Sequence, residues 1–192
     1  MNLKSIAFAI ANCACLANAH ADFSGAYDPT QWTVSNTNGG NGSAVATAGA
    51  LQLNSSNFTV FDDAPLDPST LTFSIVVAQA STISFNWAYA THDNNGSTND
   101  TFGYAVSGVA VQLSANGSYA SQSGTKSIFV NAGNSFSFQM TSTDNIFGSA
   151  IANVTGFNAI ASVPEPEGYA LALAALPVLG VALRRRRSEV RA

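Results

Sequence analysis

The segment from Asp22 to Val163 has almost no positive charge and no thiol. It contains one lysine, Lys126, and eight aspartates, but no arginine, glutamate or cysteine. The segment therefore has a net charge of −7 (one lysine minus eight aspartates), against −4 for the whole chain, because the arginines all lie near the C-terminus. Such an acidic surface repels phosphate backbones, so we expect no nucleic-acid binding. Without cysteine the segment cannot form a disulfide, a thiolate metal site or a cysteine nucleophile.

Signals of catalysis are also missing. His92 is the single histidine after Ala21, and it lies in a loop rich in Asn and Gly. The segment has no Gly-x-Ser-x-Gly elbow. It also has no Gly-rich phosphate loop, and the aspartate spacing marks no pair for glycoside hydrolysis. We therefore expect that the chain is not an enzyme.

Alternation with a period of two dominates this segment. In Thr82–Ala90, four apolar residues (Ile83, Phe85, Trp87 and Tyr89) alternate with small or polar ones. This pattern predicts a half-buried strand with an aromatic core face. Two further sets with the same period are Phe136, Phe138 and Met140, and Leu71, Phe73, Ile75 and Val77. Shorter strands are predicted at 58–61, 102–106, 109–113, 126–130 and 151–160.

These strands are separated by turn signals such as Asn94-Asn95-Gly96 and Asn116-Gly117. Many short antiparallel strands at this spacing predict an all-β, antiparallel β-sandwich, with a jelly-roll-like order, over residues 22–160. The segment Trp32–Thr47 is rich in Asn and Gly and is predicted as either an edge strand or a loop.

The N-terminus has the pattern of a signal peptide. A short positive start, Met1-Asn2-Leu3-Lys4, precedes an apolar stretch from Ser5 to Ala17. Ala19-His20-Ala21 fits the small-x-small site of signal peptidase, which predicts a signal peptide over 1–21 and a mature chain that begins at Asp22.

The C-terminus has the pattern of a membrane segment with a positive stop. Residues 168–183 are uncharged and mostly Ala, Leu and Val, and Arg184, Arg185, Arg186 and Arg187 follow directly. Sixteen helical residues span roughly 24 Å, against a hydrocarbon core of about 30 Å, so the predicted transmembrane helix is short. The arginines predict a basic cytoplasmic tail over 184–192 and place the preceding chain outside the inner membrane.

A linker over 161–167 carries a short motif, Val163, Pro164, Glu165 and Pro166, directly before this helix. The order of motif, apolar run and arginines resembles the PEP-CTERM sorting signal of Gram-negative bacteria. The resemblance implies processing by an exosortase, with signal peptidase acting at the other end of the chain. It also implies an inner-membrane precursor with a periplasmic ectodomain, delivered later to the cell surface or extracellular matrix.

A second resemblance covers about half the chain. The region 58–160 is similar to an ectodomain found in other PEP-CTERM proteins, which implies a β-sandwich and no known reaction. The matching pieces are Phe61-Asp62-Asp63, Phe85-Asn86-Trp87-Ala88-Tyr89, Asp100-Thr101-Phe102-Gly103-Tyr104, Gln122-Ser123-Gly124-Thr125 and Thr143-Asp144-Asn145.

Aspartates gather at the predicted strand ends. Asp63, Asp93, Asp100 and Asp144 lie in or beside separate loops that would meet at one end of a sandwich. Carboxylate oxygens from several loops are ligands that calcium prefers, so we predict these four residues as a possible calcium site. The alternative is that they occupy turns because turns favour Asp and Asn. No other cofactor is predicted.

Three functions are compatible with these features. The first is a structural or adhesive protein of the surface or biofilm matrix, with exopolysaccharide as a possible partner. The second is a carbohydrate-binding module that uses Trp87, Tyr89 or Tyr104 as a stacking platform, although the position of Trp87 among core residues argues against this. The third is an ice-binding surface, for which Thr70-x-Thr72 and Thr141-x-Thr143 are sparse.

Overall fold

The computed structural model describes residues 22–162, and these residues form two five-stranded antiparallel sheets. Every strand pair is antiparallel. The strands are β1 (Thr33–Asn36), β2 (Ser43–Ala46), β3 (Ala50–Asn54), β4 (Ser69–Val76), β5 (Ser81–Thr91), β6 (Asp100–Val106), β7 (Val109–Gln112), β8 (Gln122–Val130), β9 (Ser135–Ser142) and β10 (Ala150–Ala161). Two short 3-10 helices, η1 (Gly25–Tyr27) and η2 (Pro29–Gln31), precede β1, and two more, η3 (Phe61–Asp63) and η4 (Gly96–Thr98), lie between strands.

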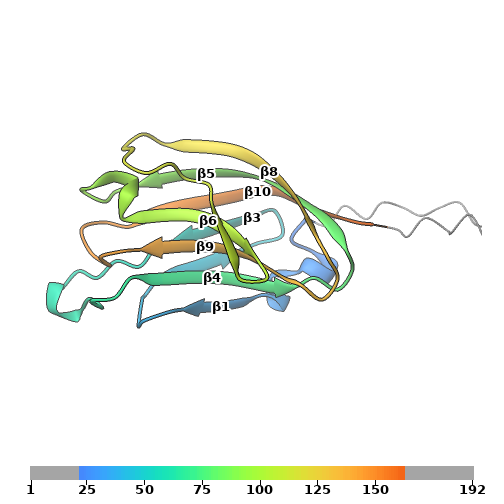
Figure 1. The fold of residues 1–192 in the computed structure, drawn as a ribbon, viewed down its shortest axis with the longest axis horizontal. Coiled ribbons are helices and arrows are strands. Elements are labelled where there is room, and N and C mark those ends of the chain that lie inside the picture. The colour runs from blue at the N-terminus through green and yellow to red at the C-terminus, as the bar shows by residue number, and fades with distance from the viewer. Residues whose placement is uncertain (1–21, 163–192) are drawn as a thin grey trace, which may run out of the picture. The chain divides into compact units, whose positions relative to one another are not determined.

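The two sheets lie face to face as a β-sandwich. The first sheet has the order β1-β4-β9-β6-β7 and the second has the order β2-β3-β10-β5-β8 (Figure 1). The longest strand, β10, is central in the second sheet, while β9 is central in the first. The predicted all-β antiparallel sandwich is therefore confirmed.

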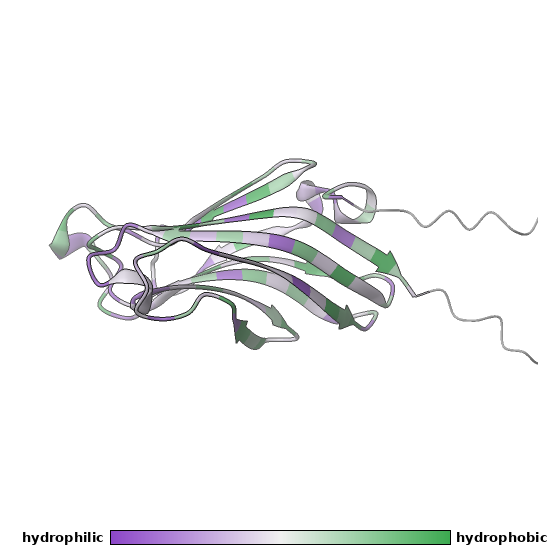
Figure 2. Ribbon diagram, turned by 90° about the horizontal axis from the view of Figure 1, so that it is seen from above, coloured by the Kyte–Doolittle hydropathy of each residue, from purple (hydrophilic) through white to green (hydrophobic). Residues whose placement is uncertain are grey.

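The period-two patterns place the core as predicted. Along β5, Ile83, Phe85 and Tyr89 are buried, and the residues between them are less so. The same alternation holds along β4 and, apart from the buried Ser137, along β9, and hydrophilic and hydrophobic bands alternate along the strands in Figure 2. The inward faces of these strands supply most of a single hydrophobic core. Successive side chains of a strand point to opposite faces of its sheet, so one face is buried and the other faces solvent.

Some sequence predictions were wrong at the level of single strands. Residues 58–61, predicted as a strand, form a bend that leads into η3. Phe58, Val60 and Phe61 do not alternate with polar residues over a sufficient length to make one buried face. The strand β3 was not predicted, although its Leu51 and Leu53 are fully buried. The uncertain segment Trp32–Thr47 contains both β1 and β2.

Aromatic rings fill the centre of the core. Trp32 stacks on Phe73 with ring centroids 4.6 Å apart and an interplanar angle of 3°, and its Nε1 donates a hydrogen bond to the carbonyl oxygen of Tyr27. Phe138 lies 4.9 Å from Phe85 and 6.1 Å from Trp32, measured between ring centroids. Rings from both sheets and from the segment before β1 thus form one continuous aromatic cluster.

The edge strand β8 is adapted to its position. Lys126, paired with Phe85, is half-buried, and its Nζ lies 5.7 Å from the ring centroid of Tyr104 in the other sheet. A charge on the inner side of an edge strand discourages another chain from extending the sheet. The lysine stem covers apolar surface while the ammonium faces an aromatic ring.

The two ends of the described chain lie at one end of the sandwich, and the loops that carry η3 and η4 lie at the other (Figure 1). The chain enters through Phe23 near η1 and leaves at Ala161, the end of β10, while η3 and η4 lie at the far end (Figure 1). Within residues 22–162 no helix is long and apolar enough to cross a membrane. The predicted signal peptide (1–21), sorting motif, transmembrane helix (168–183) and basic tail (184–192) lie outside the described residues.

Candidate functional site: a polar layer at one end of the sandwich

Buried polar side chains gather at the loop end of the sandwich. Nine of the eleven buried polar or charged side chains of the described residues lie there, and we call this group the polar end layer. It comprises Ser55, Ser56, Ser69, Asp93, Ser97, Asp100, Ser114, Ser142 and Asn145. Buried polar groups cost free energy unless they find partners, so each side chain of this layer should have a hydrogen-bond partner or a bound ligand.

Strand register creates the centre of the layer. Ser69 of β4 pairs with Ser142 of β9, which pairs with Asp100 of β6. Each of the three lies two residues away from an inward-facing apolar residue of its own strand. Its side chain therefore also points between the sheets. One row across the first sheet therefore carries two hydroxyls and a carboxylate where the neighbouring rows carry apolar side chains.

Asn145 joins this row to the surrounding loops, and all its polar groups are paired. Its Oδ1 accepts a hydrogen bond from the hydroxyl of Ser69, and its Nδ2 donates to the carbonyl oxygens of Pro65 and Asp67 at 3.1 and 3.0 Å. Its backbone N–H donates to the Ser142 hydroxyl at 3.1 Å. Asn145 has a positive φ of 60°, a conformation that asparagine tolerates better than most residues.

Asp100 is the opposite case. It is 0 % exposed, and neither of its carboxylate oxygens has a hydrogen-bond partner. Asp93, 3 % exposed, follows β5 and has one paired oxygen: Oδ1 accepts from the backbone N–H of Asn95 at 2.5 Å. The other oxygen, Oδ2, is buried without a partner. Three carboxylate oxygens of the layer are therefore buried and unpaired.

Burial and mutual repulsion make these carboxyls hard to ionise. Burial raises the pKa of Asp100 to about 7, and the charges of Asp93 and Asp144 add to the rise. The hydroxyls of Ser142 and Ser55 oppose this rise in pKa, although neither forms a hydrogen bond of normal geometry with the carboxylate. Burial also raises the pKa of Asp93, with a further contribution from Asp144.

The structure brings together three of the four predicted calcium ligands. Asp144 follows β9, and its oxygens accept hydrogen bonds from the side-chain amide of Asn99 at 2.8 Å and from the N–H of Ile146 at 3.3 Å. Its charge acts on Asp93 and Asp100, as described above. Asp63 is exposed in η3 rather than at the end of a strand, so it does not belong to the polar end layer.

Within residues 22–162, no three side chains of the types His, Cys, Asp and Glu lie in an arrangement that could hold a metal ion by themselves. Any ion in the polar end layer would need neutral oxygen ligands in addition to carboxylates.

Within residues 22–162, His92 forms no hydrogen bond to a serine or threonine hydroxyl. Its side chain is exposed, and its Nδ1 lies 3.3 Å from the carbonyl oxygen of Ser149 rather than beside a serine hydroxyl. A catalytic base needs a nucleophile within hydrogen-bonding reach.

The aromatic residues predicted as a carbohydrate platform belong to the core. Tyr89 and Tyr104 are 1 % and 6 % exposed, and the hydroxyl of Tyr89 donates a hydrogen bond to the carbonyl oxygen of Asp100. Trp87 is half-buried, with its ring 5.9 Å from Phe102 and its indole over Gly124 of the edge strand β8. A Cβ at Gly124 would approach the indole Nε1 to 2.9 Å, so the indole occupies the space of the absent side chain.

Of the four threonines named for ice binding, only Thr70 and Thr141 share a row on the outer face of the first sheet. Thr70, Thr141 and Thr101 are neighbours in register across three strands. The next row contains Thr72 but then Gln139 and Gly103, so the threonine row does not repeat.

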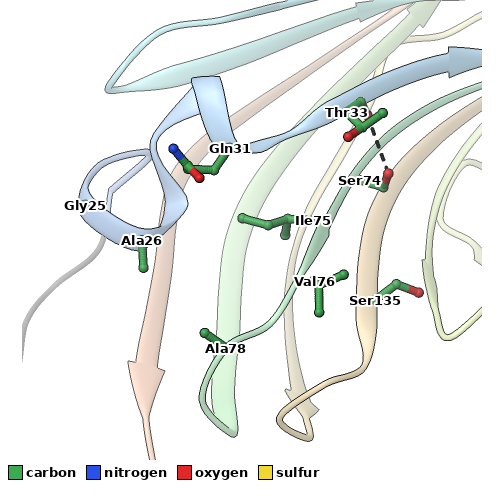
Figure 3. A pocket seen from close by; sticks show the side chains of 9 residues that line it. All are labelled: Gly25, Ala26, Gln31, Thr33, Ser74, Ile75, Val76, Ala78 and Ser135. Carbon is green, nitrogen blue, oxygen red and sulfur yellow. Dashed lines mark hydrogen bonds between the residues drawn. The ribbon is translucent and has the colours of Figure 1, made fainter.

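Two hollows lie on the outer surfaces. One, of about 480 Å³, lies between η1, the segment after η2 and the end of β4, and its lining includes Gln31, Thr33, Ser74 and Ser135 (Figure 3). None of its nine lining residues is charged, so it offers no acid or base. The other, of about 430 Å³, lies on the outer face of the second sheet and is lined by Ser84, Phe85, Asn86, Thr125, Lys126, Ser127 and Gly156.

No protein-family model matches the chain, and no curated protein matches it. Several solved structures are similar in arrangement. TmCBM61, solved with β-1,4-galactotriose, is 13 % identical with a TM-score of 0.39, over 70 % of this chain and 90 % of its own. A family 11 carbohydrate-binding module of a Clostridium thermocellum cellulase is 13 % identical with a TM-score of 0.39, over 77 % of this chain and 95 % of its own. An adhesin domain of Lys-gingipain from Porphyromonas gingivalis is 12 % identical with a TM-score of 0.44, over 70 % of this chain and 93 % of its own.

Proposed function

We propose that this chain is an exported surface or extracellular-matrix protein that an exosortase sorts through its C-terminal segment. The observation that carries the proposal is the order of three features: Val163–Pro166, the uncharged run 168–183 and the arginines 184–187. A proline disfavours the helical region for the residue before it, so the sequence favours a motif that an enzyme at the membrane surface could reach. The apolar run is shorter than a bilayer core requires, so it would hold the precursor in the membrane only weakly. A weak anchor is what a temporary membrane-bound precursor needs.

The described domain is compatible with cutting at both ends. Its last strand ends at Ala161, two residues before the motif, so removal of the C-terminal segment would remove none of the ten strands. Its first core residue is Phe23, which is fully buried and stacks on Phe157 at 4.5 Å between ring centroids. A signal-peptidase cut before Asp22 would leave Phe23 in the mature chain, as its second residue.

The domain itself acts as a non-catalytic structural or adhesive module in this proposal. Outward positions of β4, β9 and β8 are mostly uncharged and polar, for example Thr72, Ser74, Gln139 and Thr125. Uncharged hydroxyl and amide groups can exchange hydrogen bonds with a neutral polysaccharide without the desolvation cost of charges.

Sorting is tested by deleting Val163–Pro166 from the chain expressed in a host that has an exosortase. The precursor of this variant should stay in the inner membrane at the mass of the uncut C-terminus. A matched control deletes the four residues Ser188–Arg191, which leaves the motif, apolar run and arginines 184–187 in place, and it should be processed normally. If the variant without the motif still reaches the surface with normal mass, the sorting proposal is wrong.

Carbohydrate binding is a second candidate, favoured by the hollow on the outer face of the second sheet. The ammonium of Lys126 faces Tyr104 on the inner side of the sheet, while the side chains of Ser84, Asn86, Thr125 and Ser127 present hydroxyl and amide groups to the hollow. Asn86 lies beside a β-bulge in β10, where a Cβ at Gly156 would approach its Nδ2 to 2.9 Å.

A pulldown with exopolysaccharide from the same host distinguishes a carbohydrate-binding module from a purely structural one. Replacing Thr125 and Ser127 with alanine should abolish retention if the hollow binds sugar. The same replacement at Ser74, on the other sheet, is the control. Equal retention of both variants would leave the module structural, and the Trp87→Ala variant should bind like the unaltered chain because its indole packs on Gly124.

A further inference from the structure

The polar end layer lacks a partner for its carboxylates. Both oxygens of Asp100 and Oδ2 of Asp93 are buried and unpaired. A carboxylate buried without donors is strongly disfavoured, so each group must take up a proton or face a cation. Lys126, the single lysine of a segment that has no arginine, lies over Tyr104 and not in this layer.

We propose that the polar end layer binds one calcium ion, with Asp93 and Asp100 as its carboxylate ligands and Asp144 as a third negative charge beside them. The ligands come from three elements that meet at this end: the loop after β5, the first residue of β6 and the loop after β9. Neutral oxygens of the layer, such as the hydroxyls of Ser55 and Ser142, complete the coordination. Only two carboxylates bind the ion directly in this proposal. It therefore agrees with the finding that, among the described residues, no three acidic side chains could hold a metal ion by themselves.

The surrounding hydrogen bonds hold the loops in place around the unpaired oxygens. The N–H of Asp93 donates to the Thr91 hydroxyl at 3.0 Å, and Oδ1 of Asp93 is engaged by Asn95. On the other side, Asn99 holds Asp144, and the N–H of Thr143 donates to the carbonyl oxygen of Asn99 at 2.7 Å. The oxygens left without a partner in this layer are Oδ2 of Asp93 and both carboxylate oxygens of Asp100.

The chemistry of the layer selects calcium over other ions. Its donors are carboxylate, hydroxyl and carbonyl oxygens, which are hard ligands. The part of the chain that follows Ala21 has no cysteine, and His92 is exposed, so the nitrogen and sulfur ligands typical of zinc are missing here. Magnesium demands a near-ideal octahedron and keeps several waters, whereas calcium accepts irregular oxygen cages.

The test is calorimetric titration of calcium chloride into the full chain, purified in mild detergent and stripped with a chelator, at pH 8. Thermal unfolding is measured in parallel. We expect one ion bound per chain and a rise in melting temperature of roughly 5–10 °C at saturation, because the ion binds only the folded state. No heat of binding together with unchanged melting would overturn the proposal, whatever the behaviour of any variant.

Variants locate the ion. Asp100→Asn should abolish both the heat and the shift in melting temperature, while Asp63→Asn, an exposed carboxylate in η3, should keep both. If Asp100→Asn does not fold, Asp93→Asn takes its place. Full calcium binding by a folded variant at either position, or its loss in Asp63→Asn, would contradict the assignment to the polar end layer.

Discussion

The aromatic centre and the polar end layer are equally buried, but only one of them is complete in itself. In the centre, Phe138 touches rings from both sheets and has no polar atom to satisfy. In the layer, Asn145 pairs every polar group it has, whereas Asp100 beside it pairs neither carboxylate oxygen. Apolar side chains need only contact, while buried charges need specific partners. Stability should therefore depend on packing at the centre and on solution conditions at the end.

The largest effect should come from the centre. Phe138→Ala removes a fully buried ring and leaves a cavity between the sheets, which should lower the free energy of unfolding by about 3–5 kcal/mol. Chemical denaturation measures this loss. Phe129→Ala is the matched control, because Phe129 is 54 % exposed on the outer face of β8 and its loss should cost less than about 1 kcal/mol. Similar costs for the two variants would mean that the aromatic centre is not the core.

The polar end layer should respond to pH when a chelator is present. The pKa of Asp100 is raised from 3.8 to about 7 in the folded chain, where Asp93, Asp144 and Tyr89 face it. Below pH 4 the Asp100 carboxyl is protonated in both the folded and the unfolded chain. As the pH rises from 4 to 7, this carboxyl loses its proton in the unfolded chain but largely keeps it in the folded chain. Stability should therefore fall over this range, by about 4 kcal/mol, and should stay level above it as far as Asp100 is concerned.

Unfolding curves from pH 4 to pH 8 measure this loss, and Asp100→Asn should flatten most of it. A profile of Asp100→Asn identical to that of the unaltered chain would show that another group is responsible. Excess calcium should flatten the profile of the unaltered chain near neutral pH, since the ion replaces the proton as the partner of the carboxylate.

Asn145 supports the layer by hydrogen bonding alone. Asn145→Ala would leave the carbonyl oxygens of Pro65 and Asp67 and the Ser69 hydroxyl without their partner, which should cost about 2 kcal/mol at any pH. Denaturation at pH 5 and pH 8 should give the same loss. Asn94→Ala, at an exposed loop position, should be nearly neutral.

The smallest effect should come from the half-buried Trp87. Trp87→Ala uncovers Gly124 and part of Phe102, which should cost about 1–2 kcal/mol. The quantity to measure is again the free energy of unfolding. A cost near zero, combined with weaker retention on polysaccharide, would turn Trp87 from a packing residue into a binding residue.

The sequence predicted the aromatic centre better than the polar end layer for a physical reason. A buried face repeats every second residue, so the inward side chains of β4, β5 and β9 can be identified from the chain itself. The strand β3 is short, and the two buried leucines of Ala50–Asn54 are too few to mark it out. The bend at 58–61 carries apolar residues without a strand.

The site depends on register, which no local pattern contains. Asp63 and Asp100 look alike as aspartates near loops, but Asp100 lies opposite Ser142 and faces inward, whereas Asp63 is exposed in η3. Position along β6 could have separated them, because Asp100 is two residues before Phe102 and shares its face. The hydrogen-bonding role of Asn145, with its positive φ, follows only from the assembled loops.

A native mass spectrum of the chain recovered outside its host cells is the most direct test of the account. We predict a chain that begins at Asp22, lacks residues 168–192 and carries one calcium ion, which a chelator removes without unfolding the chain at pH 5. A chain that retains the apolar run and the arginines would contradict the proposed sorting. A correctly processed chain that shows no calcium in its native spectrum would contradict the view that a cation completes the polar end layer.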